Sequence, residues 1–403
     1  MKIKWFIGTI LNLTIVLGLI SSCNHQKKET PKEHPIVVMG YYVPEADYRP
    51  DQLPLDQLTH IIFSFTNVID GEMKFRNEES GEKLKALVAQ RKKHPHIKIM
   101  IACGGWGADG FSDMAHTPEN RKKFVERAVA FNKAYELDGL DMDWEYPAIP
   151  AAGTGARPED KQNFTLLMKE LREGLNTLDR KQTLTFASAG WQRYYNNVEL
   201  LEVMKHVDYM NIMTYDQVGG SSPFTGHHTP LGFITEADVK ETFAWEYMNE
   251  RREQLKERGI TSLDPRSAER IVDYCLQQGV NPEQMVIGSA FYGRAWKGVP
   301  PTNNGLYQSN TGAHIGWSAY RQIRSEFEPD AQYKRYWDPI AKAPYLYNAT
   351  DSIFISYDDT VSVRLKTEYA RQKQLGGIMF WQLGNDTKDS NSLLKAMYEA
   401  SIK

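Results

Sequence analysis

The sequence contains little cysteine, with only three such residues among its 403. Only Cys103 and Cys275 lie beyond residue 23, so a framework of disulfide bonds is not expected. Cysteine and histidine are not clustered at the spacing of zinc ligands, which argues against a structural zinc site. With 41% hydrophobic residues the chain can bury one large core, and we expect it to need neither a metal nor a cofactor.

An excess of charge of one sign is also missing. The 48 basic residues nearly balance the 51 acidic ones, which leaves a formal net charge of −3. This balance provides no basic surface for nucleic acid, so we expect no nucleic-acid partner and a neutral ligand. Aromatic residues are plentiful at 11%, with nine Trp and 21 Tyr, which suits stacking against sugar rings, although aromatic side chains more often serve the core.

Long apolar runs are missing except near the start of the sequence. Lys2 and Lys4 precede an uncharged run over residues 5–23 that is rich in Ile and Leu, which is the layout of a secretory signal. The segment Leu19-Ile20-Ser21-Ser22-Cys23 resembles a bacterial lipobox, in which cleavage before the cysteine leaves its thiol to be acylated. An uncleaved membrane anchor and an ordinary signal peptide cut elsewhere are the alternatives.

The next residues, 24–34, carry charged side chains around Pro31 without apolar periodicity, which predicts a flexible segment. We therefore expect a lipoprotein signal peptide in residues 1–22, a lipid on Cys23 and a tether in residues 23–34. The expected location is the envelope of a bacterial cell, at its outer membrane, or the secreted fraction. The lipid would be the only contact with a membrane, and we expect a monomer.

Short runs typical of β-strands recur between helical patterns along the rest of the chain. They are Ile36–Tyr42, His60–Phe65, Ile97–Cys103, Leu137–Asp143, Thr183–Ala189, Tyr209–Thr214, Met285–Phe291 and Gly377–Trp381. Strands that alternate with helices indicate parallel βαβ units, and eight of them favour a closed barrel over an open sheet. The predicted fold class is α/β, a (β/α)8 TIM barrel made of residues 35–296 and 356–403.

Two segments are too long to be simple connections. Residues 217–263 contain a loop rich in Gly and Pro, followed by a charged helix around Glu246 to Arg258. Residues 297–355 lie between the last two strands and alternate Tyr, Trp, Pro and Gly with short β-like runs, which predicts a small inserted subdomain. Such insertions occur on the C-terminal face of barrels, where barrel enzymes build their sites.

Three acidic residues stand out in the octapeptide Asp-Gly-Leu-Asp-Met-Asp-Trp-Glu, residues 138–145, at the end of the fourth predicted strand. In an extended strand Asp141, Asp143 and Glu145 point to one face. Repulsion between three close carboxyls raises the pKa of at least one, which keeps a proton available near neutral pH for a leaving group. Large apolar residues between the acids argue against a solvated surface cluster, so we predict a general acid here.

Residues 138–147 resemble the signature of glycoside hydrolase family 18, the chitinases. Four further segments agree with that family at the expected strand ends: Gly104–Trp106, Met213–Asp216, Phe291–Arg294 and Gly377–Trp381. The resemblance spans about residues 36–400. It implies retaining hydrolysis of β-1,4-N-acetylglucosaminide bonds in chitin or N-acetylglucosamine oligosaccharides. In this family the substrate assists, because its own N-acetyl oxygen attacks the anomeric carbon.

The resemblance also implies a role for each catalytic candidate. Glu145 would protonate the glycosidic oxygen and later activate water. Asp143 would orient the acetamide and stabilise the cationic oxazolinium, and it would share a proton with Asp141. Tyr215 would donate its hydroxyl hydrogen to the acetamido carbonyl. These four residues are the predicted catalytic set.

Further residues are implied as contacts to the sugar chain. Trp381 would form the floor under the cleaved sugar, and Tyr41 would lie beneath the acids. The other predicted sugar-binding residues are Gly105, Trp106, Tyr146, Met213, Asp216, Tyr292, Arg294 and Trp191. For Trp106 and Trp191 an ordinary place in the core or at the rim is an equal alternative.

One departure and three alternatives accompany this resemblance. The third strand reads Ala102-Cys103-Gly104-Gly105 where the family commonly has Ser-x-Gly-Gly, so a hydroxyl near the acids is missing.

Residues 297–355 resemble the α+β insertion domain of deep-cleft family 18 chitinases, which favours chitin over whole glycans. The alternatives are endo-β-N-acetylglucosaminidase action, peptidoglycan hydrolysis and a lectin of the same fold. Lectins of the family typically lack the acid that Glu145 supplies.

Overall fold

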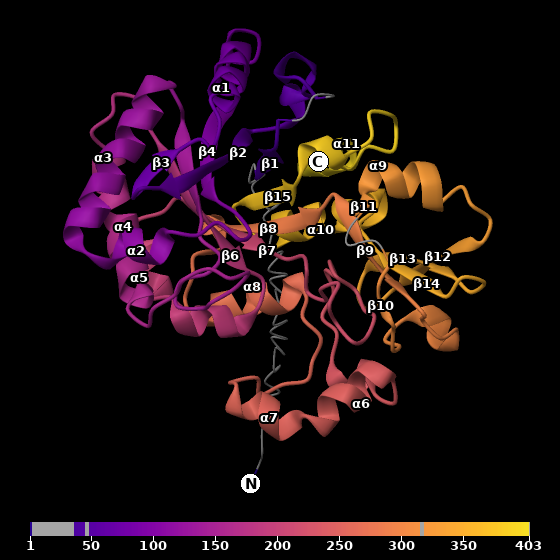
Figure 1. The fold of residues 1–403 in the computed structure, drawn as a ribbon. Coiled ribbons are helices and arrows are strands. Elements are labelled where there is room, and N and C mark those ends of the chain that lie inside the picture. The colour runs from indigo at the N-terminus through magenta and orange to yellow at the C-terminus, as the bar shows by residue number, and fades with distance from the viewer. Residues whose placement is uncertain (2–35, 45–47, 315–317, 403) are drawn as a thin grey trace. The chain divides into compact units, whose positions relative to one another are not determined.

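The computed structural model describes Met1 and residues 36–44, 48–314 and 318–402 (Figure 1). The expected signal peptide in residues 1–22, the lipidation site Cys23 and the tether in residues 23–34 lie outside this described part, apart from Met1. Within the described part, the helices are all too short or too polar to cross a membrane. Contacts divide the chain into two units, Met1–His34 and Pro35–Lys403, and the second is described here.

Eight parallel strands form a closed barrel, because β1 pairs with β15 on one side and with β2 on the other. Around the ring they are β1 (Val37–Tyr42), β15 (Gly377–Trp381), β8 (Met285–Ala290), β7 (Tyr209–Met213), β6 (Thr183–Ala189), β5 (Gly139–Asp143), β4 (Lys98–Gly104) and β2 (His60–Ile69). All eight strands predicted from the sequence are present, and the predicted (β/α)8 barrel is confirmed. An additional short strand, β3 (Glu72–Lys74), pairs antiparallel with the end of β2.

Helices surround the barrel and bury one face against it. They are α1 (Glu79–Ala89), α2 (Phe111–His116), α3 (Pro118–Ala134), α4 (Asp160–Leu175), α5 (Leu200–Met204), α8 (Ala268–Gln277), α10 (Thr360–Gln372) and α11 (Leu393–Ser401). The hydroxyl of Thr117 caps α3 by accepting a hydrogen bond from the Asn120 backbone N–H at 3.2 Å. On α4 the residues Phe164, Leu167 and Leu171 are buried at helical spacing, which gives the helix its inner face.

The long connection between β7 and β8 contains two short helices, α6 (Phe243–Glu250) and α7 (Arg252–Glu257). The sequence predicts one charged helix around Glu246 to Arg258. The structure divides this region at Arg251, whose backbone leaves the helical region with φ −103° and ψ 12°. Residues of this connection line the two cavities described below.

A second, antiparallel sheet is inserted between β8 and β15 and lies beside the barrel (Figure 1). Its strands are β9 (Tyr292–Lys297), β10 (Gly312–Ala313), β11 (Ser318–Ala319), β12 (Tyr333–Asp338), β13 (Ala343–Asn348) and β14 (Ile353–Ser356), with the short helix α9 (Tyr320–Gln322). The sheet begins at Tyr292, earlier than the boundary at residue 297 that the sequence suggests. The reason is that residues 294–297 pair with residues 353–356 of β14, so the chain leaves the barrel directly after β8.

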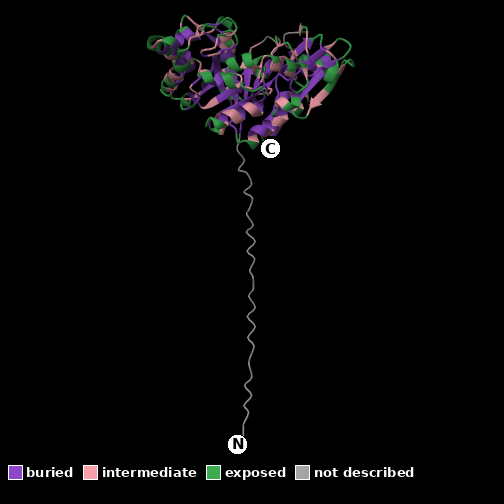
Figure 2. Cartoon of the chain, turned by 90° about the horizontal axis from the view of Figure 1, so that it is seen from below, coloured by how far each residue is buried: buried purple, intermediate pink, exposed green. Residues whose placement is uncertain are grey.

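The core has separate parts inside and outside the barrel, and buried residues concentrate in the strands (Figure 2). The larger apolar cluster fills the space between the strands and the outer helices. Inside the barrel, a smaller cluster contains Met39, Ile62, Met100, Val286 and Met379, all fully buried. This inner cluster closes the barrel from below, so a ligand can enter only above it, at the ends of the strands.

Candidate active site

A cleft with a volume of about 800 Å³ opens at the C-terminal ends of the barrel strands. Every predicted catalytic or sugar-binding residue except Asp141 lines this cleft. They are Tyr41, Gly105, Trp106, Asp143, Glu145, Tyr146, Trp191, Met213, Tyr215, Asp216, Tyr292, Arg294 and Trp381. The strands thus bring together residues that are up to 340 positions apart in the sequence.

Asp141 lies below the cleft and is fully buried. Its Oδ2 accepts a hydrogen bond from the Tyr41 hydroxyl at 2.9 Å, and its Oδ1 accepts from Thr185 and from the Asn211 side-chain amide. Burial raises the pKa of Asp141 to about 6, while these three donors oppose the rise. The missing hydroxyl at Ala102 therefore leaves Asp141 with three hydrogen-bond donors.

Asp143 is the last residue of β5, and its carboxyl is buried at the bottom of the cleft. Its Oδ1 has no hydrogen-bond partner among the described residues. The pKa of Asp143 is raised well above its usual range, first by burial and then by the negative charges of Glu145 and Asp141. The proton that the resemblance places between Asp141 and Asp143 stays a prediction, because no hydrogen bond joins these two carboxyls in the described part of the chain.

Glu145 follows the strand and is also buried, with 8% of its surface exposed. Burial raises the pKa of Glu145 to about 7, the Tyr146 hydroxyl opposes this rise, and the negative charge of Asp216 adds to it. The sequence predicts a raised pKa from mutual repulsion of the carboxyls. For Glu145, Asp143 and Asp141 alike, the larger cause is instead the loss of hydration on burial.

Three aromatic residues form the floor of the cleft. The Trp381 ring is stacked on Phe65, with ring centroids 5.4 Å apart and planes inclined by 22°. Tyr41 packs against the same Trp381 ring at 5.8 Å. Phe65 was not among the predicted site residues, although it is the aromatic residue that ends the second predicted strand. Since Trp381 is only partly buried, it presents apolar ring surface to a ligand in the cleft.

The walls carry Trp106 and Trp191, with Tyr146 between them. Trp106 is 67% exposed, which excludes an ordinary core role for this residue. The Tyr146 ring contacts Trp106 at 6.4 Å and Trp191 at 5.5 Å, both nearly edge to face. Trp191 also packs against Tyr194, so it is held more firmly than Trp106. Both indoles therefore border the cleft, the first as an exposed rim residue and the second as a half-buried wall.

Asp216 occupies the opposite side of the cleft. It accepts hydrogen bonds from Arg294 Nε at 2.7 Å and from the Tyr292 hydroxyl at 2.8 Å, and the His228 ring lies 3.7 Å away. Burial would raise the pKa of Asp216, but the nearby His228 ring and the hydrogen bond and charge of Arg294 lower it far below its usual range. Asp216 is therefore ionised while Glu145 still holds its proton. Tyr215, next to it, has a raised pKa because of burial and stays a hydroxyl donor.

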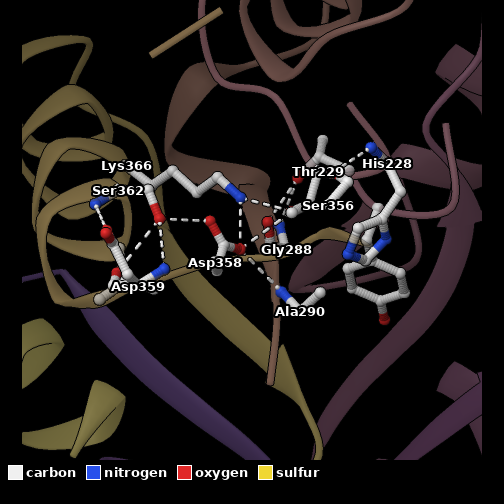
Figure 3. A network of polar contacts seen from close by, with 12 residues as sticks. His228, Thr229, Gly288, Ala290, Ser356, Asp358, Asp359, Ser362 and Lys366 are labelled. Atoms are coloured by element: carbon white, nitrogen blue, oxygen red, sulfur yellow. Dashed lines mark hydrogen bonds and ion pairs between the residues drawn. The ribbon is translucent and has the colours of Figure 1, made fainter. Parts of the chain in front are cut away.

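A buried ion pair lies at the centre of a network of polar contacts (Figure 3). Lys366 of α10 and Asp358 are fully buried, and Lys366 Nζ lies 2.6 Å from Asp358 Oδ2. The Thr229 hydroxyl donates to the same carboxyl at 2.9 Å and accepts from Lys366 at 2.6 Å. The Ala290 backbone N–H, at the end of β8, also donates to Asp358. One charged pair thus joins a helix, a barrel strand and the β7–β8 connection.

The same network reaches the cleft through His228, the neighbour of Thr229. The His228 backbone N–H donates to Ser356 Oγ at 2.9 Å, and its Nε2 lies 3.1 Å from the Tyr292 carbonyl oxygen (Figure 3). His228 and Lys366 were not predicted, because no motif marks either residue. His228 contacts Tyr292, 64 positions away, and Lys366 contacts Thr229, 137 positions away. Thr185 and Asn211 were also missed, although each occupies a predicted strand whose alternate residues face the barrel interior.

The chemistry of the cleft is that of acids and aromatic surfaces. Within the described ranges, His, Cys, Asp and Glu side chains form no group of three that could hold a metal ion. A carboxyl with a pKa near neutrality can donate a proton at pH 6 to 7 and accept it back later. A second acid next to this carboxyl and an aromatic floor can hold a sugar ring beside the proton donor. This arrangement is suited to cleaving a glycosidic bond.

Comparison with known proteins agrees with this geometry. Residues 37–386 match the model of the family described as glycosyl hydrolases family 18. Chitinase A1 of Niallia circulans is 37% identical over 76% of this chain and 43% of its own length, so this chain spans less than half of that relative. Chitinase B of Serratia marcescens is 30% identical over 84% of this chain and 75% of its own length.

A solved structure resembles the chain over almost its whole length. It is a glycoside hydrolase family 18 N-acetylglucosaminidase from Paenibacillus barengoltzii, 35% identical, with a TM-score of 0.78. The likeness covers 91% of this chain and 99% of that one. Together with the match over residues 37–386, it settles the family: the chain belongs to family 18 of the glycosyl hydrolases.

Proposed function

We propose that the protein is a chitinase that hydrolyses β-1,4-N-acetylglucosaminide bonds in chitin or its oligosaccharides with retention of configuration. The observation that carries this proposal is Glu145, a buried carboxyl with a pKa of about 7 in a cleft of about 800 Å³. The aromatic floor of Trp381 and the membership of family 18 support it. A general acid must still hold its proton at working pH, and Glu145 meets this requirement.

The proposed mechanism uses the acetamide of the substrate as the nucleophile. In the first step the acetamide oxygen forms a bond to the anomeric carbon while the glycosidic bond breaks. The leaving oxygen takes the proton of Glu145, and the sugar becomes a cationic oxazolinium. In the second step Glu145 takes a proton from water, whose oxygen bonds to the anomeric carbon from the face that the leaving group vacated. The bond between that carbon and the acetamide oxygen breaks at the same time, which restores the neutral acetamide. Two inversions at that carbon give retention.

Asp143 and Tyr215 have supporting roles in this mechanism. Asp143 lies at the base of the cleft with a free Oδ1, which suits a contact to the acetamide N–H and stabilisation of the oxazolinium charge. Tyr215 retains its hydroxyl proton because of its raised pKa, and it is proposed to donate a hydrogen bond to the acetamide oxygen. Its hydroxyl otherwise lies 3.8 Å from Met379 Sδ, a weak partner that a sugar oxygen would replace.

Release of single N-acetylglucosamine units is a second candidate for the mode of cleavage. It is favoured by the 35% identical relative that is named an N-acetylglucosaminidase and matches almost end to end. Chitinase A1 and Chitinase B, by their names, favour chitin as the substrate. The inserted sheet supports polymer binding, because Tyr292 and Arg294 of β9 line the cleft. Endo-β-N-acetylglucosaminidase action would release whole glycans from a glycoprotein and leave chitin oligosaccharides untouched.

A time course with a chitin hexasaccharide tests both the activity and its mode. Early dimers, trimers and tetramers support the chitinase, whereas accumulation of monomer and pentamer from the first minutes favours the N-acetylglucosaminidase. Proton NMR of the first product tests the mechanism, because retention gives the β-anomer. An α-anomer as the first product would contradict substrate assistance.

We also propose that the protein is exported as a lipoprotein of the cell envelope, anchored through Cys23. The proposal rests on the sequence Leu19-Ile20-Ser21-Ser22-Cys23 after an apolar run. Metabolic labelling with an alkyne fatty acid would label the wild-type protein and not the Cys23→Ala variant. Equal labelling of the two proteins would refute the anchor.

A further inference from the structure

Two arginines border the cleft beside Trp191. Arg193 belongs to the turn over residues 192–197, and Arg266 lies just before α8. Both line the cleft that contains Glu145. The Arg266 guanidinium lies 5.6 Å from the Trp191 ring centroid, over the face of that ring. A sugar that packs against Trp191 would therefore bring its substituents within reach of these cations.

These arginines differ from Arg294 and Arg270, two cationic residues close by. Arg294 is paired with Asp216, and Arg270 is paired with Asp264 at 2.9 Å. Neither Arg193 nor Arg266 forms an ion pair with any carboxylate in residues 36–44, 48–314 and 318–402. The two cations therefore lack a counter-ion in the part of the chain that the structure describes.

Their mutual repulsion is visible at Arg266. Burial lowers the pKa of its guanidinium, the Tyr146 phenol opposes this effect, and the positive charge of Arg193 lowers the pKa further. The Arg266 side chain is nevertheless open to solvent in the cleft. Two neighbouring cations without a carboxylate partner attract an anion more strongly than a single exposed arginine does.

The cleft also continues past these arginines into a second cavity of about 580 Å³. Gly190, Trp191, Arg193, Gly219, Ile260 and Arg266 border both spaces. The lining of this second cavity includes the apolar side chains of Phe224, Leu255 and Ile271, together with the carboxyls of Asp264 and Asp273. A cationic entrance in front of a partly apolar chamber suits a substituent that has a carboxylate and some carbon bulk.

An unsubstituted chitin chain is neutral, so it relieves none of this repulsion. We infer that the Trp191 side of the cleft binds an amino-sugar unit carrying a carboxylate-bearing substituent, with Arg193 and Arg266 as the residues that recognise the carboxylate. This inference rests on the proposed function, because the cleaved bond is still that of an N-acetylglucosaminide. It adds a substrate class, anionic β-1,4-linked amino-sugar chains.

Three tetrasaccharides of equal length test the inference. The first contains only N-acetylglucosamine, and the second alternates it with N-acetylmuramic acid, which carries a lactyl carboxylate. The third is the second with its carboxylates converted to methyl esters, which keeps the shape and removes the charge. We expect kcat/KM for the free acid to exceed that for the ester about tenfold, as for one charge-assisted contact.

The double variant Arg193→Gln/Arg266→Gln should bring this acid-to-ester ratio to about one, and 0.5 M salt should reduce it in the wild type. Equal wild-type rates on acid and ester would overturn the inference, as would a ratio that survives the double substitution. If the wild type hydrolyses the neutral tetrasaccharide and neither of the other two, the proposed function stands and the inference is refuted. If the wild type cleaves none of the three, both fail.

Discussion

Ala102 of β4 lies directly opposite Asp141 of β5 in the register of the barrel. Paired residues of neighbouring strands point to the same face, so a serine at position 102 would direct its hydroxyl toward the Asp141 carboxyl. In this chain that carboxyl is bound instead by Tyr41, Thr185 and Asn211. The site therefore supports its deepest acid with three donors and without a hydroxyl at position 102.

This arrangement predicts opposite effects for two substitutions. Ala102→Ser adds a donor and should lower the pKa of Asp141, which burial raises to about 6. Thr185→Val removes a donor at nearly constant volume and should raise the same pKa. NMR titration of proteins with ¹³C-labelled aspartate carboxyls measures both shifts, with Asp141→Asn used to assign the signal. Shifts of the same sign in the two variants would contradict the account.

The pH dependence of activity should follow Glu145. Its pKa is raised to about 7, and the proposed acid must be protonated, so kcat/KM should fall as the pH rises above about 7. Asp216→Asn removes a negative charge that raises this pKa, so the decline should begin at a lower pH in that variant. The pH profile of kcat/KM measures this. A decline that moves to higher pH in Asp216→Asn would be inconsistent with the assignment.

The Lys366–Asp358 pair should matter for stability. Lys366→Met leaves Asp358 buried without its cation, which should reduce the free energy of unfolding by about 3–5 kcal/mol. The double variant Lys366→Met/Asp358→Asn should recover part of this loss, because the side-chain amide oxygen can still accept from Ala290 N–H. Denaturant unfolding measures both values. A single variant less than 1 kcal/mol below the wild type would show that the pair contributes little.

Trp106 and Trp191 should respond differently to truncation. Trp106 is 67% exposed, so Trp106→Ala should leave the free energy of unfolding within about 0.5 kcal/mol of the wild type. Its kcat/KM on a chitin hexasaccharide should nevertheless fall about tenfold if the indole packs against a sugar. Trp191→Ala should also lower stability, because Trp191 packs against Tyr146 and Tyr194. An unchanged hexasaccharide rate in Trp106→Ala would make this residue an ordinary rim residue.

The barrel could be predicted from the sequence because its strands are short apolar runs with helices between them. The hairpin of β2 and β3 was missed, although Asp70-Gly71 is a typical two-residue turn. Both residues have positive φ, 55° and 71°, and Ile69 pairs with Glu72 across them. The prediction ended this strand at Phe65, before the apolar pattern itself ends.

The site was predicted as far as motifs at the strand ends could be recognised. Glu145 and Asp143 carry a local pattern, and so do the aromatic residues that follow strands. Thr229 and Lys366 meet only in the folded chain, 137 positions apart, so no local pattern connects them. The cause of the raised carboxyl pKa values could be identified only from the fold. Burial raises these pKa values more than repulsion does, and a sequence shows only which charges are close together along the chain.

The most direct test of the central claim is the Glu145→Gln variant, which keeps the shape of the side chain and removes the acid. With Glu145 as the general acid, kcat on a chitin hexasaccharide should fall by about 10²–10⁴-fold. Calorimetric titration with the same hexasaccharide should still detect binding, because the aromatic floor of Trp381 is unchanged. A variant that hydrolyses the hexasaccharide at nearly the wild-type rate would contradict the assignment of Glu145.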